Sequence, residues 1–278
     1  MQKRIARALS FFLLASFSFA SLGQPVRCEE PGSAEHKFNK DFLVRFGRDF
    51  GSVLTSPREW RDSDLLKLAA ISGVSLLVFA GDQKVHDWVV ENTSHSAEET
   101  ANFFSNLGDG GWLLGGIAAI YAAGELGGRD RLRQTALLSL ESLTATAFFV
   151  WSVKLIVGRS RPSTGESCRS FHPFSFSSSR WSFPSGHAAS AFAVATAIAD
   201  QSEEMAVDAL AYSLAALAGV ARVYEKKHWA ADVFVGSALG YFVAKKICRL
   251  NRPHDRPAVS LSFQASPQKR ALTLTVAF

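Results

Sequence analysis

Apolar residues occur along the chain in six blocks that are separated by more polar stretches: residues 68–80, 112–123, 135–157, 188–199, 209–221 and 231–243. These blocks are apolar on nearly every side and lack the alternation of a half-buried strand, which is typical of helices that are almost completely buried. The pattern therefore predicts an all-α protein, an up-and-down helical bundle of about six core helices.

The lengths of these blocks leave open whether they cross a membrane. A helix needs ~20 apolar residues to cross the hydrocarbon core, and among the blocks we expect only residues 135–157 to be comfortably long enough. The mean hydropathy of +0.08 is low for six complete spans. An integral membrane protein and a bundle with unusually apolar buried helices both fit the pattern.

The two ends of the chain differ from the helical blocks. Residues 1–23 combine a basic start, an apolar stretch and small residues, which predicts a signal peptide or an uncleaved signal anchor. We expect an exported segment over residues 24–60, a core over residues 61–250 and a tail over residues 251–278. Apolar and polar residues alternate in the tail on both sides of a turn, which predicts a short C-terminal β-hairpin, with an unstructured tail as the alternative.

The charges of the predicted loops bear on localisation. If the helices alternate in direction, the loops at residues 82–110, 158–184 and 223–230 share one end of the bundle, and the other end carries more basic residues. The bias of basic loops toward the cytoplasm then places the first set of loops on the periplasmic side of a cell-envelope membrane. A cleaved leader followed by six spans predicts the reverse orientation, and a soluble periplasmic form is the other interpretation.

Composition narrows the classes of function. Of the 278 residues, 47% are hydrophobic and 20% are charged, which excludes an intrinsically disordered chain. The net charge of +5 falls to +2 without Lys3, Arg4 and Arg7 of the leader (27 basic against 25 acidic residues), so nucleic acid is not an expected partner. The cysteines form no CxxC pair, although one bridge such as Cys28–Cys168 is possible.

Cations gather at the end of the longest apolar block. Lys154 lies near that end, where an ammonium is costly to bury unless it faces an anion or reaches solvent. Arg161 follows, and Pro162 ends any helix there, so the arginine lies at the start of a stiff loop. Arg159 lies between the two; it is either a fourth cation of this group or solvated, and we expect the latter.

The next block begins with a pattern that favours anion binding. Ser185 is suited to cap a helix that starts at Gly186 and His187. The backbone N–H groups and the dipole at such a helix start attract an anion before any side chain is considered. A simple helix-entry turn with a bystander histidine is the alternative for this segment taken alone.

A third group follows the fifth block. Arg222 is followed by His228 and then, four residues later, by Asp232, so a helix would place the imidazole and the carboxylate on one face. The carboxylate could then hold one imidazole nitrogen and leave the other free as a base or nucleophile. A surface hydrogen bond is the alternative. Metal ligation is the weakest interpretation, because no second His or Cys stands at ligand spacing and HExxH is absent.

The alternation of helices brings these groups together. In an up-and-down bundle, Lys154, His187, Arg222 and His228 all lie at one end. Cations, two imidazoles, a carboxylate and a helix N-terminus at one end suit a tetrahedral anion such as phosphate.

These residues also match a known family. Lys154 with Arg161–Pro162, then Pro184–Ser185–Gly186–His187, then Arg222, His228 and Asp232 resemble, in order and spacing, the three motifs of the type 2 phosphatidic acid phosphatase (PAP2) superfamily. The superfamily includes bacterial class A acid phosphatases and vanadium haloperoxidases. The resemblance covers about residues 60–250, with one departure at Ala221, where the family usually has serine.

The resemblance implies a role for each matching residue. His228 would be the nucleophile, Asp232 would orient it, and His187 would protonate the leaving oxygen. Phosphate oxygens would be bound by Lys154, Arg161, Ser185, Gly186 and Arg222. Members of the family need no metal or other cofactor for phosphate transfer to water.

Four functions therefore remain to be distinguished. The first is a cell-envelope phosphatase that acts on a phosphorylated lipid, either a phosphomonoester or a diphosphate. The second is an exported acid phosphatase that acts on small soluble organic phosphates. The third is a haloperoxidase that binds vanadate through His228, and the fourth is a helical envelope protein with an inactive site. In the first case the apolar helices around the cationic end predict a membrane as a partner, and the oligomeric state stays open.

Overall fold

Helices make up most of the chain that the structure, a computed structural model, describes: residues 36–252, 259–266 and 269–276. The longer helices are α2 (Lys40–Thr55), α3 (Asp62–Asn92), α4 (His95–Ser105), α5 (Gly110–Leu126), α6 (Asp130–Val157), α7 (Gly186–Gln201), α8 (Met205–Tyr224) and α9 (Ala230–Leu250). Short 3₁₀ turns lie between some of them. The predicted leader and Cys28 lie outside the described residues.

The predicted helical bundle is confirmed. Each of the six apolar blocks lies inside one of the helices α3 and α5 to α9. Two further helices, α2 and α4, were not predicted because their apolar residues do not form continuous blocks. Local capping marks where they begin: Asn39 accepts a hydrogen bond from the N–H of Phe42, and Ser94 accepts one from the N–H of Ala97.

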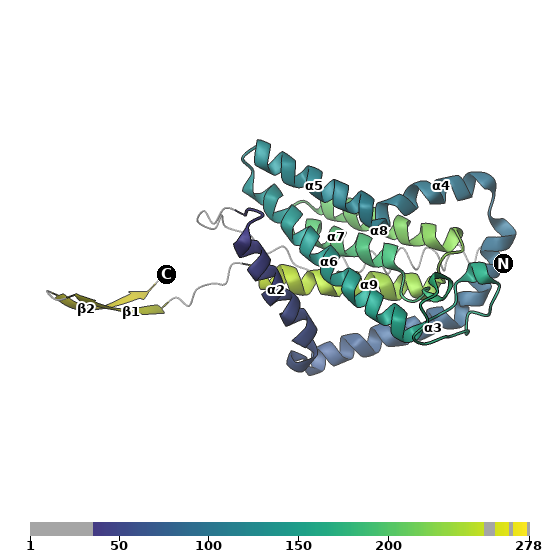
Figure 1. Cartoon of the computed structure of the whole chain (residues 1–278), viewed down its shortest axis with the longest axis horizontal. Coiled ribbons are helices and arrows are strands. Elements are labelled where there is room, and N and C mark those ends of the chain that lie inside the picture. Colours follow the sequence, from purple (N-terminus) through teal and green to yellow (C-terminus); the bar gives the residue numbers. More distant parts are fainter. Residues whose placement is uncertain (1–35, 253–258, 267–268, 277–278) are drawn as a thin grey trace.

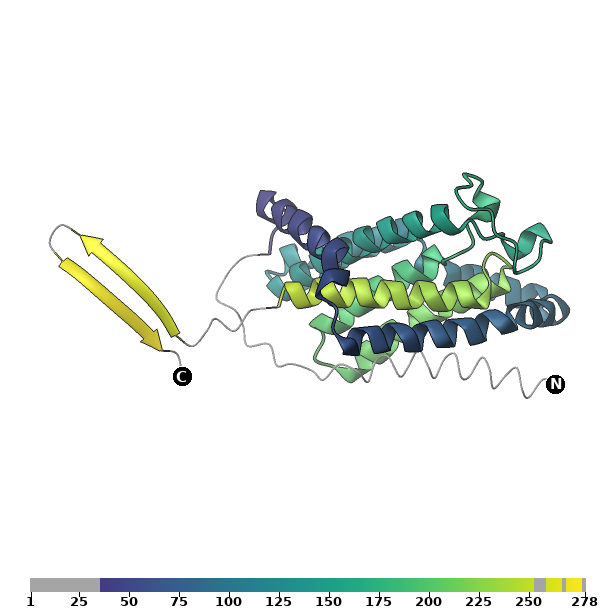
Figure 2. The same cartoon turned by 90° about the horizontal axis from the view of Figure 1, so that it is seen from below.

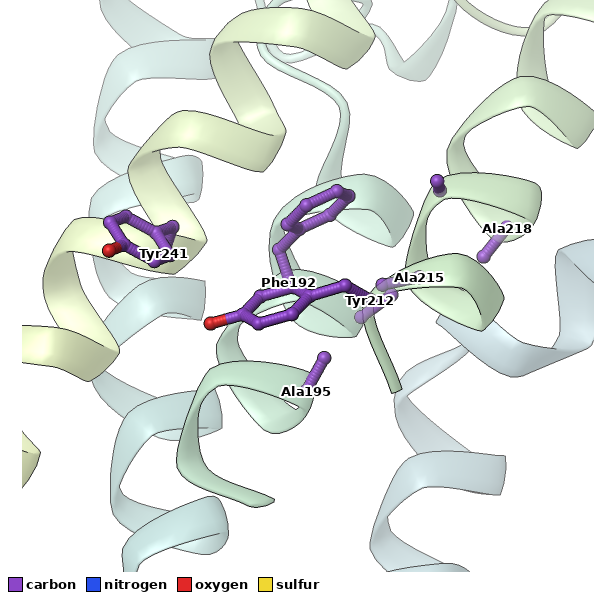
Figure 3. Packing of buried hydrophobic residues seen from close by; sticks show 8 residues of the cluster. Phe192, Ala195, Tyr212, Ala215, Ala218 and Tyr241 are labelled. Carbon is purple, nitrogen blue, oxygen red and sulfur yellow. The ribbon is translucent and has the colours of Figure 1, made fainter. Parts of the chain in front are cut away.

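Helix α7 lies in the middle of the bundle and contacts α5, α6, α8 and α9 (Figures 1 and 2). Its sequence is rich in alanine, and small side chains let neighbouring helices approach closely. Around it, Phe192 packs with Tyr212 of α8, and Tyr212 lies beside Tyr241 of α9 (Figure 3). The core therefore centres on a helix whose first turn carries His187.

Two glycines on α9 set how closely it packs on α7. A Cβ atom at Gly240 would lie 2.0 Å from the carbonyl oxygen of Ala189, and one at Gly236 would lie 2.4 Å from that of Ser185. Both spacings are shorter than any real contact, so only glycine fits at this crossing. The close approach fixes the start of α7, including Ser185, against the start of α9.

Within the described residues, three helices are long and apolar enough to cross a membrane: α3, α6 and α8. The expectation that only residues 135–157 would suffice was therefore too restrictive, because α3 and α8 extend beyond their apolar blocks. None of the most apolar window of α3 is buried within the bundle, so this helix turns apolar side chains outward on nearly every side. That distribution suits contact with lipid.

The tail forms the predicted β-hairpin. Strand β1 (Val259–Ser266) pairs in antiparallel register with β2 (Lys269–Val276), and Ser266 pairs with Lys269 beside the turn (Figure 1). The alternating pattern of the sequence was therefore sufficient to locate both strands.

Candidate active site

Backbone hydrogen bonds join the segments that carry the motif residues. The N–H of Ser185, at the start of α7, donates to the carbonyl of Asp232 on α9 at 2.9 Å. The N–H of Ser182 donates to the carbonyl of Arg159 at 3.0 Å, and the N–H of Ser163 to that of Lys226 at 3.1 Å. The long loop between α6 and α7 is thus tied both to itself and to the turn between α8 and α9.

The imidazole of His228 is buried and held by a backbone carbonyl. Its Nδ1 lies 2.6 Å from the carbonyl oxygen of Ser182 and 3.9 Å from Oδ2 of Asp232. An Nδ1–H that donates to this carbonyl leaves the lone pair on Nε2, which is the tautomer that a nucleophile needs. Asp232 is therefore beside the ring, as the spacing predicted, but Ser182 makes the short contact.

Asp232 is fully buried, and each of its oxygens has a partner. Oδ1 accepts from Arg159 at 2.6 Å, and Oδ2 accepts from the Ser182 hydroxyl at 2.5 Å and from the N–H of Trp229 at 2.9 Å. Burial alone would raise the pKa of Asp232, but His228, Arg159 and the Ser182 hydroxyl together hold it below its ordinary value. The carboxylate is therefore ionised beside the imidazole.

The environment of His228 favours its neutral form. Burial lowers the pKa of this imidazole most, and the charges of Lys154 and Arg222 lower it further, while Asp232 opposes them. A neutral imidazole at physiological pH is the reactive form of a histidine nucleophile.

His187 stands on the first turn of α7 and faces a second acidic residue. Its Nε2 lies 4.0 Å from Oδ2 of Asp109, the N-cap of α5, and its side chain is 28% exposed. Burial and the charge of Arg222 lower the pKa of His187 to about 4, although Asp109 opposes this shift. A Cβ atom at Gly108 would lie 2.7 Å from the carbonyl oxygen of His187, so the turn before α5 packs directly on the backbone of this residue.

The three motif cations surround the same region. Lys154 Nζ donates to the carbonyl of Trp181 at 2.5 Å. Arg222 donates to the hydroxyl of Ser105 at 2.6 Å and to the carboxylate of Glu225. Among the described residues, the buried Nε atoms of Arg161 and Arg222 have no hydrogen-bond partner. These N–H groups are available to a bound anion.

The segment before α7 supplies a helix N-terminus to the site. Ser185 is fully buried, and its hydroxyl accepts from the N–H of Ala188, so it caps α7 as predicted. A Cβ atom at Gly186 would lie 3.9 Å from Cε of Lys154, which places the first N–H groups of α7 near that cation. An anion beside Lys154 would therefore meet the positive end of the helix.

The expectation for Arg159 was wrong. Its side chain is fully buried and forms ion pairs with Asp232 and, at 2.7 Å, with Asp82 of α3. An exposed loop was expected at this position, whereas the loop folds over the N-terminal end of α9, where Arg159 meets Asp232. The carboxylate at Asp82, directly after an apolar block, was the signal that could have suggested a buried partner.

Other contacts of the site were also missed from the sequence. Three of these residues lie outside the motif positions named above: Ser182, Glu225 and Asp109. Serine, glutamate and aspartate are common in loops and turns, so nothing marked them in the sequence. Within the described residues, no group of three or more His, Cys, Asp and Glu side chains is arranged to hold a metal ion.

A shallow groove of about 600 Å³ runs along α5 and includes Asp109, whose Oδ2 lies 4.0 Å from Nε2 of His187. It is lined by Asp109, Gly111, Trp112, Gly115, Gly116 and Ala119. A Cβ atom at Gly115 or Gly116 would meet no other atom within 4 Å, so the glycines leave open space on this face.

Comparison with known proteins agrees with this geometry. Residues 135–254 match the family model described as the PAP2 superfamily. Lipid A 1-phosphatase of Porphyromonas gingivalis is 38% identical over 66 residues, which are 23% of this chain and 15% of that protein. The chain thus aligns with only a small part of that relative's length.

Two solved structures are similar. The transmembrane PAP2 type phosphatidylglycerolphosphate phosphatase from Bacillus subtilis superposes with a TM-score of 0.53 at 22% identity, covering 68% of this chain and 97% of that chain. The structure of Aquifex aeolicus LpxE gives a TM-score of 0.49 at 21% identity, covering 60% of this chain and 94% of that chain. The first likeness shows that the fold is shared.

The match over residues 135–254 and the shared fold relate the chain to the PAP2 superfamily. Its long apolar helices associate it with a membrane.

Proposed function

We propose that this protein removes phosphate from a phosphorylated lipid, a phosphomonoester or a diphosphate, on the periplasmic side of the cell envelope. The observation that carries the proposal is the buried, neutral His228, whose Nδ1 is held by Ser182 beside cations with free N–H groups. The names of two relatives, a lipid A phosphatase and a phosphatidylglycerolphosphate phosphatase, point to lipid substrates.

In the first step, Nε2 of His228 attacks phosphorus and the bond to the leaving oxygen breaks. Asp232 stabilises the imidazolium that forms, and protonated His187 gives its proton to the leaving oxygen. Lys154, Arg161 and Arg222 bind the equatorial oxygens, assisted by the Ser185 hydroxyl and the N–H of Gly186.

In the second step, water attacks the phosphohistidine. Neutral His187 takes a proton from this water, the bond between phosphorus and Nε2 breaks, and inorganic phosphate leaves. His187 is thereby protonated in the product complex and loses this proton as phosphate leaves, and His228 returns to its neutral form.

The groove on α5 suits the apolar part of a lipid. It begins at Asp109, which lies beside His187, and the leaving group departs on the His187 side of the phosphate. The rest of the groove has apolar or glycine surfaces on a helix without charged residues between Gly110 and Ala123. Acyl or isoprenyl chains are the groups that such a surface binds.

Phosphate release from a panel of substrates tests the proposal. With the full chain in detergent micelles and EDTA present, we expect kcat/KM for long-chain lipid phosphates to exceed that for glycerol phosphate by at least about tenfold. Equal or better turnover of soluble phosphates would favour the acid phosphatase instead. Halide oxidation with added vanadate would favour the haloperoxidase, and inhibition by EDTA would contradict a metal-independent reaction.

The same panel tests the groove. Gly115→Leu fills open space without a clash, so the fold should persist while KM for long-chain substrates rises about tenfold and that for p-nitrophenyl phosphate stays unchanged. Gly73→Leu on α3 is the matched control, because a side chain there also meets open space. Unchanged KM values for long-chain substrates would show that the acyl or isoprenyl groups bind outside this groove.

A further inference from the structure

Helix α3 sends one carboxylate into the bundle beside the active site. Asp82 is 1% exposed, although the helix around it is mostly exposed. Its Oδ1 accepts from the N–H of Ala231, in the first turn of α9, at 2.9 Å. Its Oδ2 accepts from Nη2 of Arg159 at 2.7 Å. Asp82 therefore contacts both the helix that follows His228 and the cation next to Asp232.

Arg159 is fixed through its whole guanidinium group. Nη1 donates to Asp232, while Nε and Nη2 donate to the carbonyl of Cys168 at 3.0 and 2.7 Å. The guanidinium carbon lies 4.7 Å from the ring centre of Phe79 and 5.3 Å from that of Trp229. Only a planar, multidentate cation satisfies these contacts, so lysine would not replace it.

We propose that Arg159 and Asp82 are positioning residues for the nucleophile, which deepens the proposed function and rests on it. Arg159 holds Oδ1 of Asp232, which directs Oδ2 to the Ser182 hydroxyl and the N–H of Trp229. Ser182, held in this way, presents its carbonyl to Nδ1 of His228. Asp82 in turn fixes Arg159 and the first turn of α9.

The two positioning residues act on Asp232 in different ways, Arg159 by direct contact and Asp82 through Arg159, which makes their effects separable. The charged groups around Asp232 come from every element packed on it: Lys154 of α6, Arg159 and Arg161 of the following loop, His228 before α9, and Asp82 of α3. Loss of the Arg159 charge raises the pKa of Asp232, so the carboxylate is protonated at higher pH. Asp82 acts instead through the position of Arg159 and of the first turn of α9.

The test compares kcat/KM against pH for Arg159→Gln and Asp82→Asn, with p-nitrophenyl phosphate as the substrate. We expect the acid limb to move up by about one pH unit or more in Arg159→Gln, because the essential carboxylate is lost earlier as pH falls. In Asp82→Asn, kcat should fall by about tenfold with KM nearly unchanged, because Arg159 is held less firmly. Damage to the fold alone lowers the amount of active enzyme without moving a limb.

Arg169→Gln is the matched control, because this arginine lies in the same loop and is exposed. Turnover by the wild type and this control tests the phosphatase function itself. If both are active, an acid limb that does not rise in Arg159→Gln overturns the role of Arg159, and a wild-type kcat in Asp82→Asn overturns that of Asp82.

A second variant, Arg159→Lys, tests the role of Arg159 if Arg159→Gln does not fold. Arg159→Lys keeps the charge but loses the bidentate and stacking contacts, so kcat should fall about tenfold or more while the acid limb stays near that of the wild type. Wild-type kcat in this variant would overturn the proposal.

Discussion

Replacement of His228 by alanine is expected to abolish phosphate release, with a loss of at least about 10³-fold in kcat. The variant lacks the nitrogen that attacks phosphorus, and no neighbouring imidazole can take its place, because His187 lies on the opposite, leaving-group side in the proposed reaction. Steady-state phosphate release from a long-chain lipid phosphate measures the effect. Unchanged turnover would reject the nucleophile assignment.

Two further variants separate chemistry from folding at this position. His228→Asn retains a donor that can reach the Ser182 carbonyl, so it should keep thermal stability closer to that of the wild type and still lack activity. His95→Ala removes a histidine that is 86% exposed on α4 and should retain full activity. Activity in His228→Asn, or its loss in His95→Ala, would contradict the account.

Replacement of His187 by alanine is expected to give a loss that depends on the leaving group. An alkoxide leaves only when it receives a proton, so turnover of a lipid phosphomonoester should fall by roughly 10²–10⁴-fold. A p-nitrophenolate ion leaves without protonation, so p-nitrophenyl phosphate should lose far less. The ratio of kcat between the two substrates is the measurement, and equal losses would argue against an acid role.

The pKa of His187 makes this prediction specific. In the free enzyme, burial and the motif cations lower it to about 4, so the imidazole is neutral near pH 7. A bound phosphate dianion neutralises those cations and raises the pKa, so the acid forms in the complex with substrate. The profile of kcat against pH reports the ionisation of groups in the enzyme–substrate complex. We therefore expect the basic limb of this profile to depend on His187.

The sequence was sufficient to predict that the segments carrying these residues meet at one end of the bundle. His228 and Asp232 are separated by one helical turn, and Ser185 precedes an alanine-rich helix, so spacing and capping alone place them. Apolar blocks located six helices because their length and composition exclude strands. Spacing, capping residues and apolar blocks are local patterns, and a single sequence shows such patterns directly.

Contacts between distant segments could not be predicted in this way. Ser182 reaches His228 across 46 positions, and Arg159 reaches Asp82 across 77. Such contacts depend on how the long loop folds over α9, which in turn depends on the close packing of α7 at Gly236 and Gly240. Nothing in the local pattern around Arg159 distinguishes a buried arginine from a solvated one.

Transfer of the phosphoryl group to His228 is the central claim, and rapid-quench labelling tests it most directly. The full chain is mixed with a lipid phosphate that carries radioactive phosphorus, quenched in alkali, which preserves phosphohistidine, and digested. We predict label on the peptide that contains His228 and none in His228→Asn. Turnover without labelled enzyme, or label on another residue, would contradict the account.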